Sequence, residues 1–226
     1  YTREYLYIKE LYEKGELGKI QYARCAHYQD MEYWPKYWAG FPPLMHPTHA
    51  VAPCLALLNK RPNKVFGVGS GSMREELVKN YGNPFPFEAA FIMFEDSDVC
   101  IEMERFMFEV ARDYTECFHI YGSKSSFEWQ QIEDELPVIY RFLESDGRRG
   151  LPTISERIEL PDYAYRLPEP IQKFTRNFEY TNSRTSQTYL AGGGHGGSHP
   201  HLVHEFVRSI IEDRRPAVDE ITAAYR

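Results

Sequence analysis

The chain has 226 residues, with 33 acidic against 26 basic side chains and a formal net charge of −7. Its composition, 42% hydrophobic and 26% charged residues, is typical of a globular domain with a sizeable core. The acidic balance argues against nucleic acid as a partner, and no apolar run approaches the ~20 residues that span a bilayer. We therefore expect a soluble, cytoplasmic protein that binds neither nucleic acid nor membrane.

The cysteines include no CxxC pair, so the sequence predicts neither a disulfide framework nor a cysteine metal site. We expect free, buried thiols in a reducing compartment. Late in the chain His201 and His204 share a helix face, but no carboxylate completes a ligand set, and we predict no metal site. The four cysteines are Cys25, Cys54, Cys100 and Cys117.

The first quarter of the chain predicts a helix, a strand, a loop and a second helix. Residues 3–14 carry apolar side chains at helical spacing, and residues 19–30 alternate with a period close to two. Residues 31–45 form a loop rich in aromatic rings and prolines. An apolar helix follows from Pro47 or Thr48 to Asn59, and a proline is well tolerated in its first turn.

Strands are predicted next, at residues 63–72, 85–96 and 98–110, followed by a hairpin of 115–123 and 125–131. In the third strand the two sets of side chains alternate, which favours an antiparallel sheet with helices on only one face. One set is Val99, Ile101 and Met103, and the opposite set is Cys100, Glu102 and Glu104.

The last third predicts an irregular excursion at residues 144–170 and an amphipathic helix at 199–212. This order of elements predicts an α+β fold: an open, largely antiparallel sheet with helices on one face. Because the chain starts and stops within helical patterns, we expect a fragment whose residues 1–226 form one domain. The apolar residues of the last helix, expected to face inward, are Leu202, Val203, Phe206, Ile210 and Ile211.

A glycine-rich stretch, GGGHGG at residues 192–197, formally satisfies the dinucleotide fingerprint G-x-G-x-x-G, with Asp219 downstream. Five glycines in six positions satisfy almost any spacing, and no parallel strands follow, so we predict no dinucleotide site here. Glycine allows close approach of a ligand to the backbone, and the stretch surrounds His195. A ligand-contact loop is therefore one interpretation and a flexible linker is the other.

His46 and His49 flank the start of the predicted helix at 47–59. The positive end of the helix dipole there is expected to lower the pKa of a histidine and favour its neutral form. A neutral imidazole can accept a proton from a hydroxyl group and return it. The alternative is a histidine that caps or packs against the helix.

Three segments resemble the C-terminal domain of the Gfo/Idh/MocA oxidoreductases, and the similarity covers nearly the whole chain. The PTH and GGHGG motifs look most like a branch that includes the NAD-dependent α-N-acetylgalactosaminidases. The segments are GELGKIQYARCAHY (15–28), PPLMHPTHAVAPCLALL followed by NKVFGVGSG (42–71), and GGHGGSHPHLVHEFVRSIIEDRRPAVDEITAA (193–224).

This resemblance implies a two-domain enzyme whose Rossmann domain, which binds NAD or NADP, lies upstream and is missing from the chain. It implies that the uncovered sheet face is the interface of a homo-oligomer. His49 matches the family's acid–base histidine, and His195 matches the histidine of the substrate loop. His46 stands where the glycosidase branch carries a tyrosine, and Met45 replaces the aspartate that usual dehydrogenases carry.

Three functions remain open. The first is an NAD(P)-dependent oxidoreductase acting on a sugar or polyol, in which Trp34, Tyr37 and Trp38 either stack on the sugar or serve packing. The second is an NAD-dependent glycoside hydrolase. The third is a non-catalytic assembly or ligand-binding domain. In either enzyme, we expect this chain alone to be inactive.

Overall fold

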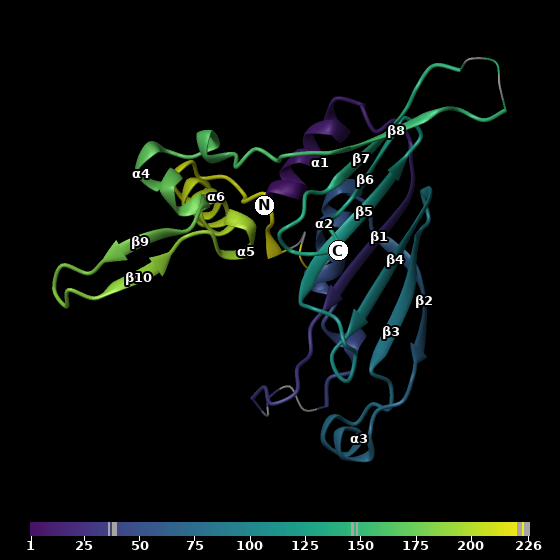
Figure 1. Ribbon diagram of the computed structural model, residues 1–226, viewed down its shortest axis with the longest axis horizontal. Coiled ribbons are helices and arrows are strands. Elements are labelled where there is room, and N and C mark those ends of the chain that lie inside the picture. The colour runs from purple at the N-terminus through teal and green to yellow at the C-terminus, as the bar shows by residue number, and fades with distance from the viewer. Residues whose placement is uncertain (36, 38–39, 146, 148, 221–222, 224–226) are drawn as a thin grey trace. The chain divides into compact units, whose positions relative to one another are not determined.

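The computed structural model describes residues 1–35, 37, 40–145, 147, 149–220 and 223 (Figure 1). The chain divides into two compact units, each described by itself. The first unit consists of the described residues within 1–14 and 159–223, and the second of those within 15–158. That residues 1–226 form one domain stays a prediction.

An eight-stranded sheet forms the second unit, in the order β2-β3-β4-β1-β5-β6-β7-β8. Only β1 and β4 pair in parallel among the described strands, so the sheet is largely antiparallel, as predicted. Its strands are β1 (Ile20–Tyr28), β2 (Pro62–Ser70), β3 (Phe87–Phe94), β4 (Ser97–Phe106), β5 (Thr115–Gly122), β6 (Ser125–Glu128), β7 (Val138–Phe142) and β8 (Thr153–Arg157).

The helix α2 (Thr48–Leu58) packs on the centre of this sheet, against β1, β4 and β5. Figure 1 shows α2 behind these strands, on one side of the sheet. Val99, Ile101 and Met103 of β4 are buried as the alternation predicts, and Ile101 is fully buried, but Glu104 of the opposite set is buried as well. Helix α2 ends at Asn59, whose left-handed backbone conformation stops the helix. The predicted α+β fold is confirmed.

A short helix that the sequence analysis missed, α3 (Glu75–Tyr81), closes one end of the second unit. Its Leu77 and Tyr81 belong to a small core with Met31 and Phe108, and the rings of Tyr81 and Phe108 lie 4.1 Å apart. This cluster anchors the start of the aromatic loop, because Met31 donates its backbone N–H to the carbonyl of Met107 at 2.6 Å.

The first unit combines helices with a two-stranded sheet of β9 and β10 that the sequence analysis also missed. Arg3 of α1 donates to the carbonyl of Thr175 at 2.9 Å, which joins the two chain segments of this unit. Its elements are α1 (Arg3–Glu13), η3 (Ala164–Arg166), α4 (Glu169–Gln172), η4 (Lys173–Thr175), β9 (Phe178–Thr181), β10 (Thr188–Ala191), α5 (Gly194–Gly197) and α6 (His199–Ile211).

The predicted orientation of the last helix was wrong. Helix α6 buries His201 and Ser209, and the ring of Tyr1 stacks on His201 with 6.5 Å between the centroids. Periodicity identifies the residues that share a helix face, but not the face that meets a partner within the chain. The five apolar residues expected inside are 47–73% exposed: Leu202, Val203, Phe206, Ile210 and Ile211.

The excursion at 144–170 is only partly irregular, because it contains the edge strand β8 and the turn η3. All four cysteines are free, with Cys25, Cys54 and Cys117 buried and Cys100 half-buried. Among the described residues no helix is both long and apolar enough to cross a membrane.

Replacing Ile101 by alanine should lower the free energy of unfolding by about 2–5 kcal/mol, because the truncation leaves a cavity in the centre of the sheet. Chemical denaturation measures this change. Val65→Ala on the edge strand β2 is the control, since Val65 is 61% exposed and should change stability by less than about 0.5 kcal/mol. Equal losses of stability in both variants would contradict the position of Ile101 in the core.

Candidate active site

A row of polar side chains crosses the sheet beneath the N-terminus of α2. Glu88 of β3 pairs with Arg105 of β4, Arg105 with His27 of β1, and His27 with Glu116 of β5. Register partners on adjacent strands point to the same face, so all four side chains face the side that α2 covers. Arg105 is completely buried and His27 is 2% exposed. Such a row is costly inside a core unless its members are paired.

One member of this row, Glu88, is hydrogen-bonded to the segment that leads into α2. Glu88 accepts hydrogen bonds from the backbone N–H of Leu44 at 2.8 Å and from the side-chain amide of Asn83 at 2.9 Å. Leu44 belongs to the short helix η2 (Pro43–Met45), and His46 follows directly. The carboxylate of Glu88 therefore fixes the backbone just before His46 and His49.

His49 and Glu116 form the central contact of the site, with His49 Nδ1 lying 2.8 Å from Glu116 Oε1. Burial tends to raise the pKa of Glu116, but hydrogen bonds from His49 and Tyr114 lower it to about 2. Glu116 is thus an ionised acceptor, so Nδ1 of His49 is the donor. This leaves Nε2 of His49 to face other groups, and the side chain is 40% exposed.

The pKa of His49 is shifted in the opposite direction from those of the other two histidines. The hydrogen bond to Glu116 is the largest influence on His49 and raises its pKa. Burial lowers the pKa of His46, and burial together with the charge of Arg105 lowers that of His27 to about 3. The three rings form a cluster, with centroids 5.0 Å apart for His27 and His49 and 5.1 Å apart for His46 and His49.

The prediction that the helix dipole would leave His49 with a lowered pKa was therefore wrong. The carboxylate of Glu116 outweighs the dipole because it lies at hydrogen-bond distance, whereas the dipole acts as a partial charge. The N-cap residue of α2 is Pro47, which makes no capping hydrogen bond with a side chain. The imidazole of His49 is a group that can take up and release a proton, and Glu116 favours its protonated form.

The glycine-rich loop lies in the first unit, where His195 has a left-handed backbone (φ 46°) and its ring lies 5.1 Å from that of His199. A cavity of about 400 Å³ adjoins the loop. His195 itself is exposed. The residues that line the cavity are Ile171, Phe174, Gly192, Gly194, His199, Pro200 and Val203.

These glycines do not fit a dinucleotide. A Cβ on Gly192 would lie 2.1 Å from the carbonyl oxygen of Arg176, and one on Gly193 would lie 2.1 Å from the side chain of Asn177. The chain's own close packing accounts for the glycines, and the helix α5 that they enter has only four residues. Glycine is therefore required at these two positions by the close approach of the chain's own atoms.

Two of the three predicted stacking residues, Trp34 and Tyr37, lie in the loop after β1. Trp34 is 43% exposed and Tyr37 is 68% exposed, so both rings present surface to solvent. Trp38 lies outside the described residues.

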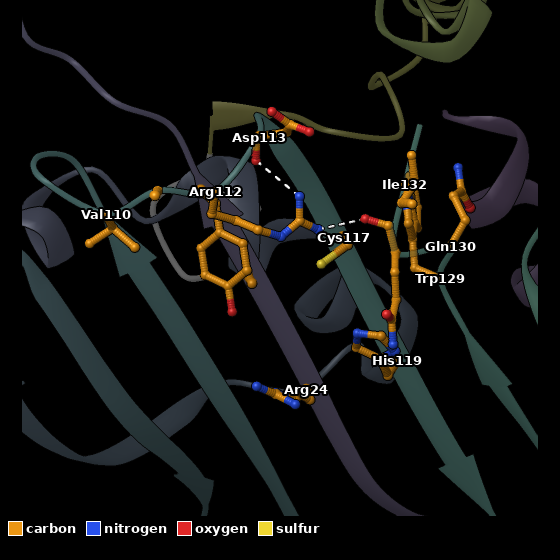
Figure 2. Close-up of a pocket in the computed structure, with 13 residues that line it drawn as sticks. Arg24, Val110, Arg112, Asp113, Cys117, His119, Trp129, Gln130 and Ile132 are labelled. Atoms are coloured by element: carbon orange, nitrogen blue, oxygen red, sulfur yellow. Dashed lines mark hydrogen bonds between the residues drawn. The ribbon is translucent and has the colours of Figure 1, made fainter. Parts of the chain in front are cut away.

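A second cavity, of about 810 Å³, lies on the opposite face of the sheet (Figure 2). Arg24 and His119 approach it from the centre of the sheet, and Arg112 closes one side by donating to the carbonyl of Gln131 at 2.7 Å. Its walls also include Tyr28, Cys117, Trp129 and Ile132.

Sequence reasoning missed Glu116, Tyr114, Arg105 and His27 as parts of the site. The signal was present in the alternation: Arg105 continues the inward series of Ile101 and Met103, and His27 that of Cys25. A charged or polar residue at an inward position of a strand is expensive, and this cost marks a candidate site.

The pH dependence of stability should reveal the pair of His49 and Glu116. The raised pKa of His49 contributes stability below pH 6.5, the ordinary pKa of histidine, and this contribution is lost as the pH rises through the raised value. The lowered pKa of Glu116 contributes stability above pH 4.5, the ordinary pKa of glutamate, and this contribution is lost as the pH falls toward 2. Glu116→Gln should therefore lower the thermal unfolding midpoint most between pH 4.5 and 6.5, measured with a chelator present. A difference that stays constant with pH would contradict the pairing.

No protein-family model and no curated protein matches the sequence. Solved structures with the same fold do match. An NAD binding oxidoreductase from Klebsiella pneumoniae is 16% identical with a TM-score of 0.62, over 93% of this chain and 55% of that one. A levoglucosan dehydrogenase in complex with NADH is 17% identical with a TM-score of 0.58, over 91% and 53%. The myo-inositol 2-dehydrogenase of Lactobacillus plantarum is 15% identical with a TM-score of 0.54, over 98% and 55%.

The chain thus spans about half the length of each of these structures. At this level of identity the likeness shows a common fold: the mixed sheet with helices, found in part of several NAD-binding oxidoreductases.

Proposed function

We propose that this chain is the substrate-binding part of an oxidoreductase that oxidises a hydroxyl group of a sugar or polyol with NAD or NADP. The observation that carries the proposal is the hydrogen bond from His49 Nδ1 to Glu116, which leaves an exposed imidazole ready to handle a proton. The fold supports it, because it is shared with dehydrogenases of levoglucosan and of myo-inositol.

Oxidation of an alcohol to a carbonyl releases a hydroxyl proton and a hydride. Nε2 of His49 accepts the proton, and Glu116 stabilises the imidazolium that forms, because an ionised carboxylate at 2.8 Å favours the charged ring. Glu116 also fixes the tautomer and the orientation of the ring. It is a positioning residue, and His49 is the proton acceptor.

The hydride requires an acceptor, NAD or NADP, and two glycines of the 192–197 loop pack closely against the chain's own atoms. The proposal therefore places the nicotinamide cofactor on polypeptide outside this chain, in line with its coverage of about half of the similar structures. It follows that the chain by itself does not turn over substrate.

The proposal assigns substrate contacts to His46, His195, Trp34, Tyr37 and Trp38. His46 lies beside the proton acceptor and is kept neutral by burial, so it can exchange hydrogen bonds with sugar hydroxyls. The exposed rings of Trp34 and Tyr37 suit the apolar face of a pyranose.

His49→Gln in the complete protein should lower kcat by about 10²–10⁴-fold, because glutamine can form hydrogen bonds but cannot take up a proton. His204→Gln, the same change at a histidine outside the site, should retain activity. Reduction of NAD or NADP is followed spectrophotometrically with a panel of sugars and polyols. Undiminished turnover of His49→Gln would remove this residue from the mechanism.

The same preparations separate the alternative functions. Release of nitrophenol from nitrophenyl glycosides without net cofactor reduction would favour an NAD-dependent glycoside hydrolase. Neither reaction, with a cofactor bound and a broad substrate panel, would favour an assembly or ligand-binding role.

We also propose that copies of the protein associate through the sheet face opposite α2. That face presents Phe66, Val68 and Phe91, which are 39–58% exposed, and the second cavity. Exposed apolar surface of this kind favours a partner. Phe66→Glu should reduce the mass measured by light scattering, whereas Val65→Glu, on the same strand but pointing to the other face, should not. A monomeric wild-type protein would contradict this proposal.

A further inference from the structure

The three-ring cluster at the head of α2 contains a group that the proton-transfer role does not use. His27 is 2% exposed, and neither of its ring nitrogens has a hydrogen-bond partner among the described residues. A neutral imidazole carries one donor and one acceptor, and burying both without partners costs free energy. A buried polar group left in this state in a well-packed sheet calls for an explanation.

His27 is directed toward two other possible ligands. Its Nε2 lies 3.9 Å from Glu116 Oε1, and its ring centroid lies 5.0 Å from that of His49. One ligand atom each from His27, His49 and Glu116 can be chosen so that all three atoms lie within 4.8 Å of one another. The register places His27 and Glu116 side by side on β1 and β5, and α2 brings His49 above them.

We propose that His27, His49 and Glu116 form a binding site for a divalent transition-metal ion of the Zn²⁺ type. Two imidazoles and one carboxylate are ligands that Zn²⁺ and its neighbours prefer, whereas Mg²⁺ and Ca²⁺ prefer sites of oxygen atoms. This site is independent of the proposed function, because it requires only side chains of this chain.

The geometry needs small adjustments. With bonds of about 2.0–2.1 Å, ligand atoms around a tetrahedral ion are separated by about 3.4 Å. The contact of His49 with Glu116, now 2.8 Å, would open by ~0.5 Å, and that of His27 with Glu116, now 3.9 Å, would close by ~0.5 Å. His49 is 40% exposed, so the fourth position would be open to water or to a ligand.

Two neighbouring side chains would influence how strongly the site binds the ion. Tyr114 donates a hydrogen bond to Glu116 and would hold the carboxylate in place around the ion. Arg105 is fully buried next to His27 in the register, and its positive charge opposes the ion. The ion would also displace the proton from Nδ1 of His49, so that a metal-loaded site could no longer accept a proton from substrate. Metal binding and proton transfer are therefore mutually exclusive uses of His49.

Binding can be measured on the chain without any assay of activity. Protein stripped with a chelator is titrated with ZnCl₂ by calorimetry, and Co²⁺ is added separately because its visible spectrum reports coordination by nitrogen and oxygen. We expect one Zn²⁺ per chain and cobalt bands typical of four or five ligands. Absence of saturable uptake, or an octahedral cobalt spectrum, would overturn the proposal.

Variants identify the ligands. His27→Leu fills the buried space without a nitrogen and should abolish the uptake of Zn²⁺, and Glu116→Gln should weaken it at least tenfold. The matched control is His119→Gln, which changes a histidine on the opposite face of the same sheet. Circular dichroism and thermal melts confirm that each variant is folded; Glu116→Gln decides the question if His27→Leu is not. Uptake unchanged by a folded ligand variant, or lost equally in His119→Gln, would refute the site.

Discussion

The burial of a charged row across the middle of the sheet is the constraint on which this site depends. Arg105 and His27 have no access to solvent, and Glu116 is ionised beside them. Buried charges are costly unless partners compensate them. Arg105 donates to the carbonyls of His27 and Phe106, and the head of α2 supplies His49 as the partner of Glu116. The position of α2 on the sheet therefore matters for the stability of this row.

The two faces of the sheet differ in how their polar side chains are placed. On the α2 side, a buried polar row crosses β3, β4, β1 and β5, and it borders an apolar core that includes Ile101 and Met103. On the opposite side, tyrosines and glutamates are paired across strands, as in Tyr22 with Glu102 at 2.6 Å and Tyr121 with Glu128 at 3.0 Å. These pairs satisfy polar groups without burying them, which keeps that face available for contact with another surface.

Much of the fold was accessible from the sequence, because alternation and helical spacing report directly on burial. The strands β1 to β6 and the helices α1, α2 and α6 were all expected at close to their observed positions. The inward face of α6 was not, since a pattern within one helix carries no information on its partner. His49 was recognisable from its place at a helix start. Glu116 was not, because its role arises from the pairing of β5 with β1, and no local pattern reports which strands will be neighbours.

The place of β1 in the sheet has a consequence for how the chain folds. This strand comes early in the sequence, yet it lies between β4 and β5, which are made much later. None of its ladder hydrogen bonds can form until residues beyond 97 are available, so half-made chains expose both of its edges. Sheets that depend on such distant pairings fold slowly, and the nascent strand is a site at which chaperones or aggregation compete with folding.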